Sequence, residues 1–279
     1  MEKIIVAIDG VNLNMPTVDF ACFLGRLTNS SITGIFLENL MAVQKPVLKS
    51  TDLMAFINWE TDKNSPEYLE KIKQIEKNIS FFTEACANRS VRCHIHRKRG
   101  LPSKEMIGES RFADLIVLDA STSFNHIFEG SPTEFVRDIL KEAECPVVIA
   151  PEHFESIDEI VFIYDGNKSD IFALKQFSCL FPQLSDRKII LLQATKDGVW
   201  AGREKHNLKE WLGNHYSEIR FETLKENPAD FSFKYLVKKK NIFIVMGAYG
   251  RSSVSRFFRH SHADLIIRTM GQPIFISHY

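Results

Sequence analysis

Two glycines and a following serine form the segment of this sequence with the clearest chemical potential. Gly247 and Gly250 stand three residues apart, and His260 and Ser261 follow at the expected start of a helix. Glycines placed after a strand let the backbone approach an anion, because they lack a β-carbon and tolerate positive φ. The free N–H groups of a helix start, together with a hydroxyl, favour phosphate. The segment therefore predicts a phosphate-binding loop.

Aspartates stand at the ends of two apolar runs. Asp9 and Asp165 are each followed by glycine and then by a polar stretch. Aspartate is common in this setting because its carboxylate bonds to the backbone of a turn. In an open parallel sheet, however, the ends of such strands also face the ligand crevice. Both interpretations, turn residue and ligand contact, stay open from the sequence.

Histidines offer two further possibilities, a metal site and a nucleophile–base pair. His94 and His96 share one face of an expected strand, but no third ligand stands at a suggestive spacing. His260 and His262 flank Ser261, but neither an acid partner nor a G-x-S-x-G elbow accompanies them. We therefore predict neither a metal site nor catalytic residues.

The elements that must position these residues occur twice along the chain. Each half opens on an apolar run ending in Asp-Gly and closes on a strand entered through proline. A period of about half the chain indicates a duplicated domain, because solenoid repeats are much shorter. We place the joint near residues 151–157 and the domains at 1–153 and 154–279. The matching runs are 3–10 with 159–166, 31–39 with 188–195, 113–120 with 241–248, and 145–151 with 272–278.

The pattern within each half predicts an α/β fold. The strand candidates are continuous apolar runs, which is typical of parallel strands covered on both faces. Helical patterns lie between them, and the clearest spans 66–88, where Ser65 is placed to cap the helix and Pro66 to open it. Its apolar stripe consists of Leu69, Ile72, Ile75, Ile79, Phe82 and Cys86. Alternating strands and helices predict two doubly wound parallel sheets.

Composition limits the classes of function. The 279 residues carry 35 Lys+Arg against 35 Asp+Glu, and this balance argues against broad binding to nucleic acid or anionic membrane. No apolar run reaches the length of a membrane span, and the first residues show no signal-peptide pattern. The five cysteines include no C-x-x-C pair and read as free thiols. We expect a cytoplasmic protein.

The stretch at 40–65 is longer than an ordinary connection, which has about 2–6 residues. It contains several apolar residues and a proline. A flap over the sheet and a dimer contact are both consistent with it.

The chemistry-bearing segment resembles a known family motif. Gly247-x2-Gly250-x9-His260-Ser261 is similar to the Gly-x2-Gly-x9-Gly-Ser/Thr pattern with which many universal stress proteins bind ATP. Asp165 matches the family's aspartate on the adenine side, and the closing Gln-Pro-Ile-Phe-Ile strand follows at the family's spacing. The resemblance covers nearly the whole chain, as two such domains in tandem.

The resemblance implies both an architecture and a ligand. The two domains would have the adenine nucleotide alpha hydrolase-like fold and pack as a pseudo-dimer, with the strands at 147–150 and 274–277 meeting between them. Whether two chains associate further stays open. ATP or AMP would be the ligand of the second half. The contacting residues would be Asp165, Ala194, Gly247, Gly250, His260 and Ser261.

Both halves depart from the family motif. His260 stands where the family has the glycine that brings backbone against the phosphates. In the first half, counting back from Pro146 places Thr133 and Glu134 at the Gly-Ser position, and Ala120 and Ser123 at the two earlier glycines. Gly130-Ser131 lies nearby without an upstream glycine pair. We therefore expect the first half not to bind ATP in the family manner.

Three functions compete on these grounds. The first is a non-enzymatic stress-response protein that binds an adenine nucleotide in its second half. The second is an interaction or regulatory protein of the same fold that has lost the nucleotide, with residues 40–65 as the place for a partner. The third, an ATP-hydrolysing or adenylating enzyme, ranks last because no SGGxDS-like pyrophosphate loop is present.

Overall fold

The structure is a computed structural model of the 279-residue chain. It describes residues 1–38, 44–51, 54–125, 128–164, 166–194, 199–224, 235–247 and 260–277. At positions 44–49, 51, 54–61, 194, 224 and 260–262 it describes the backbone alone.

The elements follow the predicted order in both halves, and most strands are shorter by one or two residues at an end. The first half contains β1 (Lys3–Asp9), α1 (Met15–Thr28), β2 (Ser31–Leu37), β3 (Gln44–Thr51), β4 (Met54–Thr61), α2 (Pro66–Asn88), β5 (Cys93–Lys98), α3 (Pro102–Ser110), β6 (Leu115–Leu118), α4 (Glu134–Glu142) and β7 (Val147–Ile149). The second half contains β8 (Glu159–Tyr164), α5 (Lys168–Leu180), the short 3-10 helix η2 (Pro182–Leu184), β9 (Lys188–Ala194), α6 (Gly202–Gly213), β10 (Ile219–Leu224), β11 (Ile242–Gly247), α8 (His260–Thr269) and β12 (Ile274–Ser277).

All strands except β3 and β4 join one ten-stranded sheet in the order β10-β9-β8-β11-β12-β7-β6-β1-β2-β5. Within each half every neighbouring pair is parallel. The strand order reverses beside β1 in the first half and beside β8 in the second. The predicted doubly wound parallel arrangement is confirmed within each half, and the two halves are joined into a single sheet.

The two halves are joined by their last strands. β12 runs antiparallel to β7, with Phe275 opposite Val148 and Ile276 opposite Val147. All four of these side chains are buried. This pairing covers two apolar edge strands that could otherwise pair with other chains and cause aggregation. This confirms the predicted meeting of 147–150 with 274–277, whereas the division at 153/154 stays a prediction within the segment between β7 and β8.

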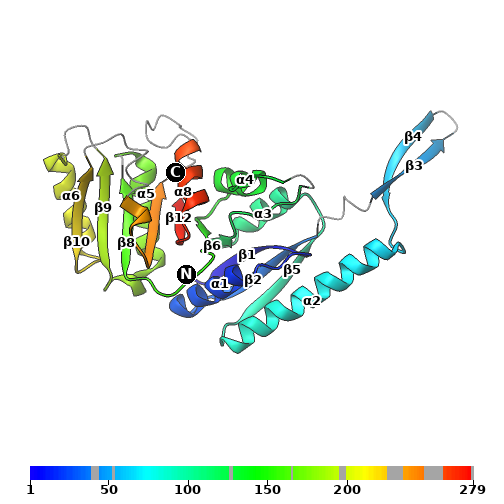
Figure 1. Cartoon of the computed structure of the whole chain (residues 1–279), viewed down its shortest axis with the longest axis horizontal. Coiled ribbons are helices and arrows are strands. Elements are labelled where there is room, and N and C mark those ends of the chain that lie inside the picture. The colour runs from blue at the N-terminus through cyan, green and yellow to red at the C-terminus, as the bar shows by residue number, and fades with distance from the viewer. Residues whose placement is uncertain are drawn as a thin grey trace.

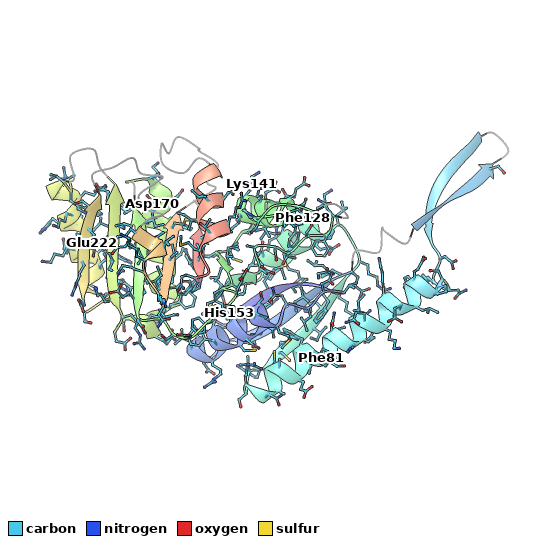
Figure 2. All side chains as sticks on the ribbon, viewed as in Figure 1. Phe81, Phe128, Lys141, His153, Asp170 and Glu222 are labelled. Atoms are coloured by element: carbon cyan, nitrogen blue, oxygen red, sulfur yellow. The ribbon has the colours of Figure 1, made fainter. Side chains whose placement is uncertain are left out.

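Each face of the sheet carries one hydrophobic core that runs through both halves. Helices α1, α2, α5 and α6 contribute to one core, and α3, α4 and α8 to the other. Around the first half, α3 and α4 lie on one side of the strands and α1 and α2 on the opposite side (Figure 1). Phe128 and Phe81 mark these two sides (Figure 2). Because both cores cross the β7–β12 joint, neither half buries its apolar surface alone.

Phenylalanine rings fill much of the core beside α5. Phe177 packs edge-on against Phe162, Phe243 and Phe275, with ring centroids 5.0–5.7 Å apart. Phe20 of α1 reaches Phe243 at 6.3 Å, so the aromatic contacts extend from one half to the other. The abundance of phenylalanine is thus explained by core packing.

Helix α2 has the predicted bounds and the predicted cap. The Ser65 hydroxyl accepts the amide of Tyr68 at 3.3 Å, and Pro66 opens the helix. The apolar stripe is buried at Ile75, Phe82 and Cys86, but Leu69 is 56% exposed. The predicted stripe is therefore buried only over its later turns, because the first turns of α2 extend beyond the sheet (Figure 1).

The insertion at 40–65 contains the β3–β4 hairpin. Among the described strands these two pair with each other alone, in antiparallel register from Gln44–Thr61 to Thr51–Met54. The hairpin stands away from the ten-stranded sheet at the outer end of α2 (Figure 1). The insertion is therefore no flap over the sheet of its own half.

Three observations bear on the remaining predictions. All five cysteines are free, with Cys22 and Cys86 buried. None of the helices in the described part of the chain has the length and apolar character that a membrane span needs. Among the described residues, no cluster of three or more His, Cys, Asp or Glu side chains could hold a metal ion.

The continuous core leads to a first prediction. Phe275→Ala should lower the free energy of unfolding by about 3–5 kcal/mol, because it removes a fully buried ring at the joint. Phe112→Ala is the matched control, since Phe112 is 77% exposed, and it should change stability by no more than about 0.5 kcal/mol. Urea unfolding followed by circular dichroism and tryptophan fluorescence should give one coincident transition. Two separate transitions, of which Phe275→Ala moves only one, would contradict the shared core.

Candidate functional site

The reversal of strand order identifies the edge where a ligand is expected. In open α/β sheets, ligands bind beyond the carboxyl ends of the two strands that flank the reversal. In the second half these strands are β8, which ends at Tyr164, and β11, which ends at Gly247. The equivalent strands of the first half are β1, ending at Asp9, and β6, ending at Leu118.

Gly247 lies where the first turn of α5 approaches the end of β11. A β-carbon added to Gly247 would come within 2.3 Å of the Ser169 carbonyl carbon and 2.4 Å of the Asp170 nitrogen. Real β-carbons do not approach backbone so closely, so only glycine fits. Gly247 therefore has a packing role, independent of any ligand.

The start of α5 is fixed by its own residues. Asn167 is the N-cap, and its backbone N–H donates a hydrogen bond to the Asp170 carboxylate at 3.4 Å. Gly166 has φ of +91°, a conformation that favours glycine. Asp170, in the first turn of α5, is 2% exposed. This compact turn brings the helix N-terminus to the strand ends.

The predicted contact residues fall into two groups. Ala194 ends β9, Gly247 ends β11, and His260 and Ser261 are the first two residues of α8. The backbone therefore brings these four positions to the carboxyl edge of the second-half strands. Asp165 and Gly250 lie outside the described residues.

A polar–aromatic cluster at the same strand ends was not predicted. The Tyr164 and Trp200 rings stack at 5.3 Å with an angle of 16° between their planes. The Tyr164 hydroxyl donates to Glu204 Oε1 at 2.5 Å, and both rings are almost fully buried. Gln193, the register neighbour of Tyr164, is 8% exposed, and its side-chain oxygen accepts no hydrogen bond from any described residue. An aromatic residue directly before Asp165 was the only signal in the sequence.

The first half has closed the equivalent edge with its own groups. Asp9 Oδ1 accepts the Val11 amide at 3.0 Å, and Oδ2 accepts the Asn12 side chain at 2.7 Å. Asn14 donates to Asp119 Oδ2 at 2.6 Å and so links the start of α1 to the end of β6. Asp9 therefore acts as a turn residue, and the start of α1 is held at the end of β6 by a side-chain hydrogen bond.

Backbone hydrogen bonds correct the alignment of the two halves by one residue. The Ile116 amide bonds to the Pro146 carbonyl and the Ile244 amide to the Pro273 carbonyl, so Ile116 and Ile244 are equivalent. Counting three residues forward from each shows that Asp119, rather than the predicted Ala120, is the first-half equivalent of Gly247. The error arose because the prediction counted back from the closing proline through the last helix. The segment between the strand end and that proline is one residue longer in the first half than in the second. A carboxylate thus stands in the first half where the second has a glycine.

The N-terminus of α4 is also occupied. Thr133 accepts the Val136 amide at 3.3 Å, and its own amide bonds to the Ala120 carbonyl at 3.3 Å. Glu134 is the first residue of the helix. A carboxylate at this position would repel phosphate. The geometry agrees with the expectation that Thr133 and Glu134 replace the phosphate-binding pair.

Helix α2 seals the turn after β1. The buried Asn78 side chain donates to the Gly10 carbonyl at 2.9 Å and to the Val11 carbonyl at 2.8 Å. At the end of β2 the buried Glu38 carboxylate pairs with Arg97 and Arg99. The hydrogen bond to Glu38 raises the pKa of the Arg97 guanidinium above its ordinary value. These contacts leave the first-half edge internally satisfied.

Comparison with known proteins supports the architecture. No sequence-family model matches the chain, and no curated protein matches it either. Among solved structures, a universal stress protein from Archaeoglobus fulgidus superimposes with a TM-score of 0.71 at 17% identity, covering 99% of this chain and 98% of that one. A candidate universal stress protein from Pseudomonas aeruginosa gives a TM-score of 0.62 at 12% identity, covering 100% and 93%. The chain therefore has the two-domain fold of universal stress proteins.

The packing at Gly247 leads to a second prediction. Gly247→Ala should destabilise the protein by about 1–3 kcal/mol, because the new methyl group meets the backbone of α5. Gly108→Ala in α3 is the control, since nothing lies within 4 Å of its β-carbon position and alanine favours a helix. Thermal unfolding of both variants measures the difference. Equal melting temperatures for the two variants would show that α5 does not pack closely on β11.

Proposed function

We propose that this chain is a universal stress protein-like protein that binds an adenine nucleotide, ATP or AMP, in its second half. The observation that carries the proposal is the difference between the two strand-reversal edges. Asn14, Asp119, Thr133 and Asn78 fill the first with internal hydrogen bonds. The second combines the Gly247 strand end with two helix N-termini, those of α5 and α8.

Each nucleotide part is assigned to a different side of this edge. Asp165 and Ala194 would contact the adenine side, as the family resemblance implies. Gly247, Gly250 and the start of α8 at Ser261 would hold the phosphates. Backbone amides and a hydroxyl at a helix start supply hydrogen-bond donors and the positive end of the helix dipole.

His260 sets the strength of binding in this proposal. It is the first residue of α8, where the family has a glycine. A β-carbon at this place keeps the backbone further from the phosphates, so we expect weaker binding than a complete motif would give. We further propose that the bound nucleotide is held without turnover.

An interaction role without nucleotide is the second candidate. It is favoured by the β3–β4 hairpin, which stands away from the ten-stranded sheet (Figure 1). Two-stranded hairpins are marginally stable in water on their own, and a partner would stabilise this one. This candidate would be favoured by a pull-down in which a partner binds the chain only when residues 40–65 are present and binds equally well with and without ATP.

The nucleotide proposal makes a third prediction. Calorimetric titration of the full chain should show ATP or AMP binding, and Ser261→Ala should raise Kd by about tenfold, because a hydrogen bond to a charged group is lost. Ser131→Ala is the matched control in the first half and should leave Kd unchanged. Absence of heat and of a thermal shift at millimolar nucleotide would contradict the proposal. Phosphate release above background that Gly250→Asp abolishes would contradict binding without turnover.

A further inference from the structure

A groove of about 900 Å³ lies between α5 and α6. This volume is within the range of small-molecule sites, about 300–1,000 Å³. Its described lining residues include neither Gly247 nor any residue of α8. The groove is thus distinct from the surfaces assigned to the nucleotide phosphates.

The floor of the groove is apolar. Leu174 and Leu208 are buried beneath it, whereas Ile171 and Trp211 are half-buried and keep part of their surface exposed. A ligand lying on the floor would remove this apolar surface from water, which is favourable in proportion to its area.

The rim of the groove carries an excess of positive charge. Lys168, Lys175 and Arg203 line it and are exposed, and none of them forms an ion pair with a residue in the described ranges. Glu204 is the acidic residue among the described lining, and its carboxylate already accepts the Tyr164 hydroxyl. The charge of the groove therefore favours an anion.

The contrast with the first half sharpens this point. At its corresponding edge, Arg97 and Arg99 pair with Glu38, and Lys98 pairs with Glu109. Basic side chains there are neutralised by partners within the protein. Lys168, Lys175 and Arg203 around the groove have no such partner among the residues that the structure describes.

Both helices begin at the same end of the groove. Lys168 is the first residue of α5 and Arg203 the second of α6, and the N-cap of α6 is Ala201, which provides no side-chain hydrogen bond. Cations in the first turn oppose the helix dipole. A bound anion would satisfy the dipoles, the unpaired cations and the uncapped amides of α6 together.

We propose that this groove binds a fatty-acid-type amphiphile, with its carboxylate between Lys168 and Arg203 and its chain over Ile171, Leu208 and Trp211. The size of the groove favours a small molecule over a protein partner. From Lys168 to Lys175 the helix advances about 10 Å. A protein interface of ordinary size would need about 800 Å² from each partner.

Decanoate is the test ligand, added to the full chain below its micelle-forming concentration and followed by calorimetry and tryptophan fluorescence. Decanol has the same chain without the charge, and decyltrimethylammonium has the opposite charge. Decanoate should bind at least about tenfold more tightly than either, because its charge is complementary to the rim. Equal affinity for decanoate and decanol would overturn the proposal.

Substitutions locate the site. Lys168→Glu combined with Arg203→Glu should weaken decanoate binding at least about tenfold by replacing attraction with repulsion. Lys209→Glu is the control, since Lys209 is exposed on α6 outside the described lining, and it should leave Kd within about twofold. Ile171→Asn should weaken decanoate binding, because it makes the floor of the groove less apolar. All variants should remain folded at the temperature of the titration, which circular dichroism of each variant checks.

Two further outcomes decide between occupants and between sites. Ser261→Ala should leave decanoate binding intact, so failure of the nucleotide proposal and failure of the groove proposal are distinguishable. Sedimentation should show no decanoate-dependent change in mass. A dimer that decanoate dissociates, and that the double variant abolishes, would assign the groove to a second copy of the chain and overturn the proposal.

Discussion

The antiparallel pairing of β12 with β7 is the contact on which the rest of the structure depends. It places Phe275 opposite Val148 in the middle of a ten-stranded sheet and carries both hydrophobic cores from one half into the other. It also sets the direction of the strands. Because the halves meet antiparallel, the carboxyl ends of their parallel strands point to opposite edges of the sheet. Each strand-reversal edge must therefore be completed by residues of its own half.

This separation allows the two copies to differ in their sites while sharing a core. In the first half, Asn14 bridges to Asp119, Asn78 seals the turn after β1, and Glu38 neutralises two arginines. Each of these bonds occupies polar groups at the edge that would otherwise be available to a ligand. The second half lacks the long α2 helix and has the 12-residue α6 instead, beside which a groove remains. The same scaffold thus supports an edge filled by its own side chains in the first half and a groove between α5 and α6 in the second.

Sequence patterns predicted those features that depend on local periodicity. The duplicated strands and the helix at 66–88 with its Ser65 cap were foreseen in this way. The pairing of the closing strands was foreseen only through the resemblance to a known family. Features that depend on how far an element extends were not, such as the exposure of Leu69 and the hairpin within 40–65. The Tyr164–Trp200 stack was also missed, because it joins residues 36 positions apart and leaves no periodic signal. The sequence placed Ala194, Gly247, His260 and Ser261 near one another at strand and helix ends, whereas their role in binding a ligand stays a prediction.

Gly247 illustrates why a motif glycine has to be weighed against packing. The approach of α5 to the end of β11 requires a glycine whatever the ligand, because a β-carbon would lie 2.3 Å from the Ser169 carbonyl carbon. At the equivalent place in the first half, Asp119 is accommodated, and its carboxylate accepts the Asn14 side chain and the Ser121 amide. A change between glycine and aspartate at this one position thus alters both the helix packing and the charge presented to an anion. The Asp119 side chain that links to Asn14 in the first half could therefore not be accommodated at Gly247 in the second.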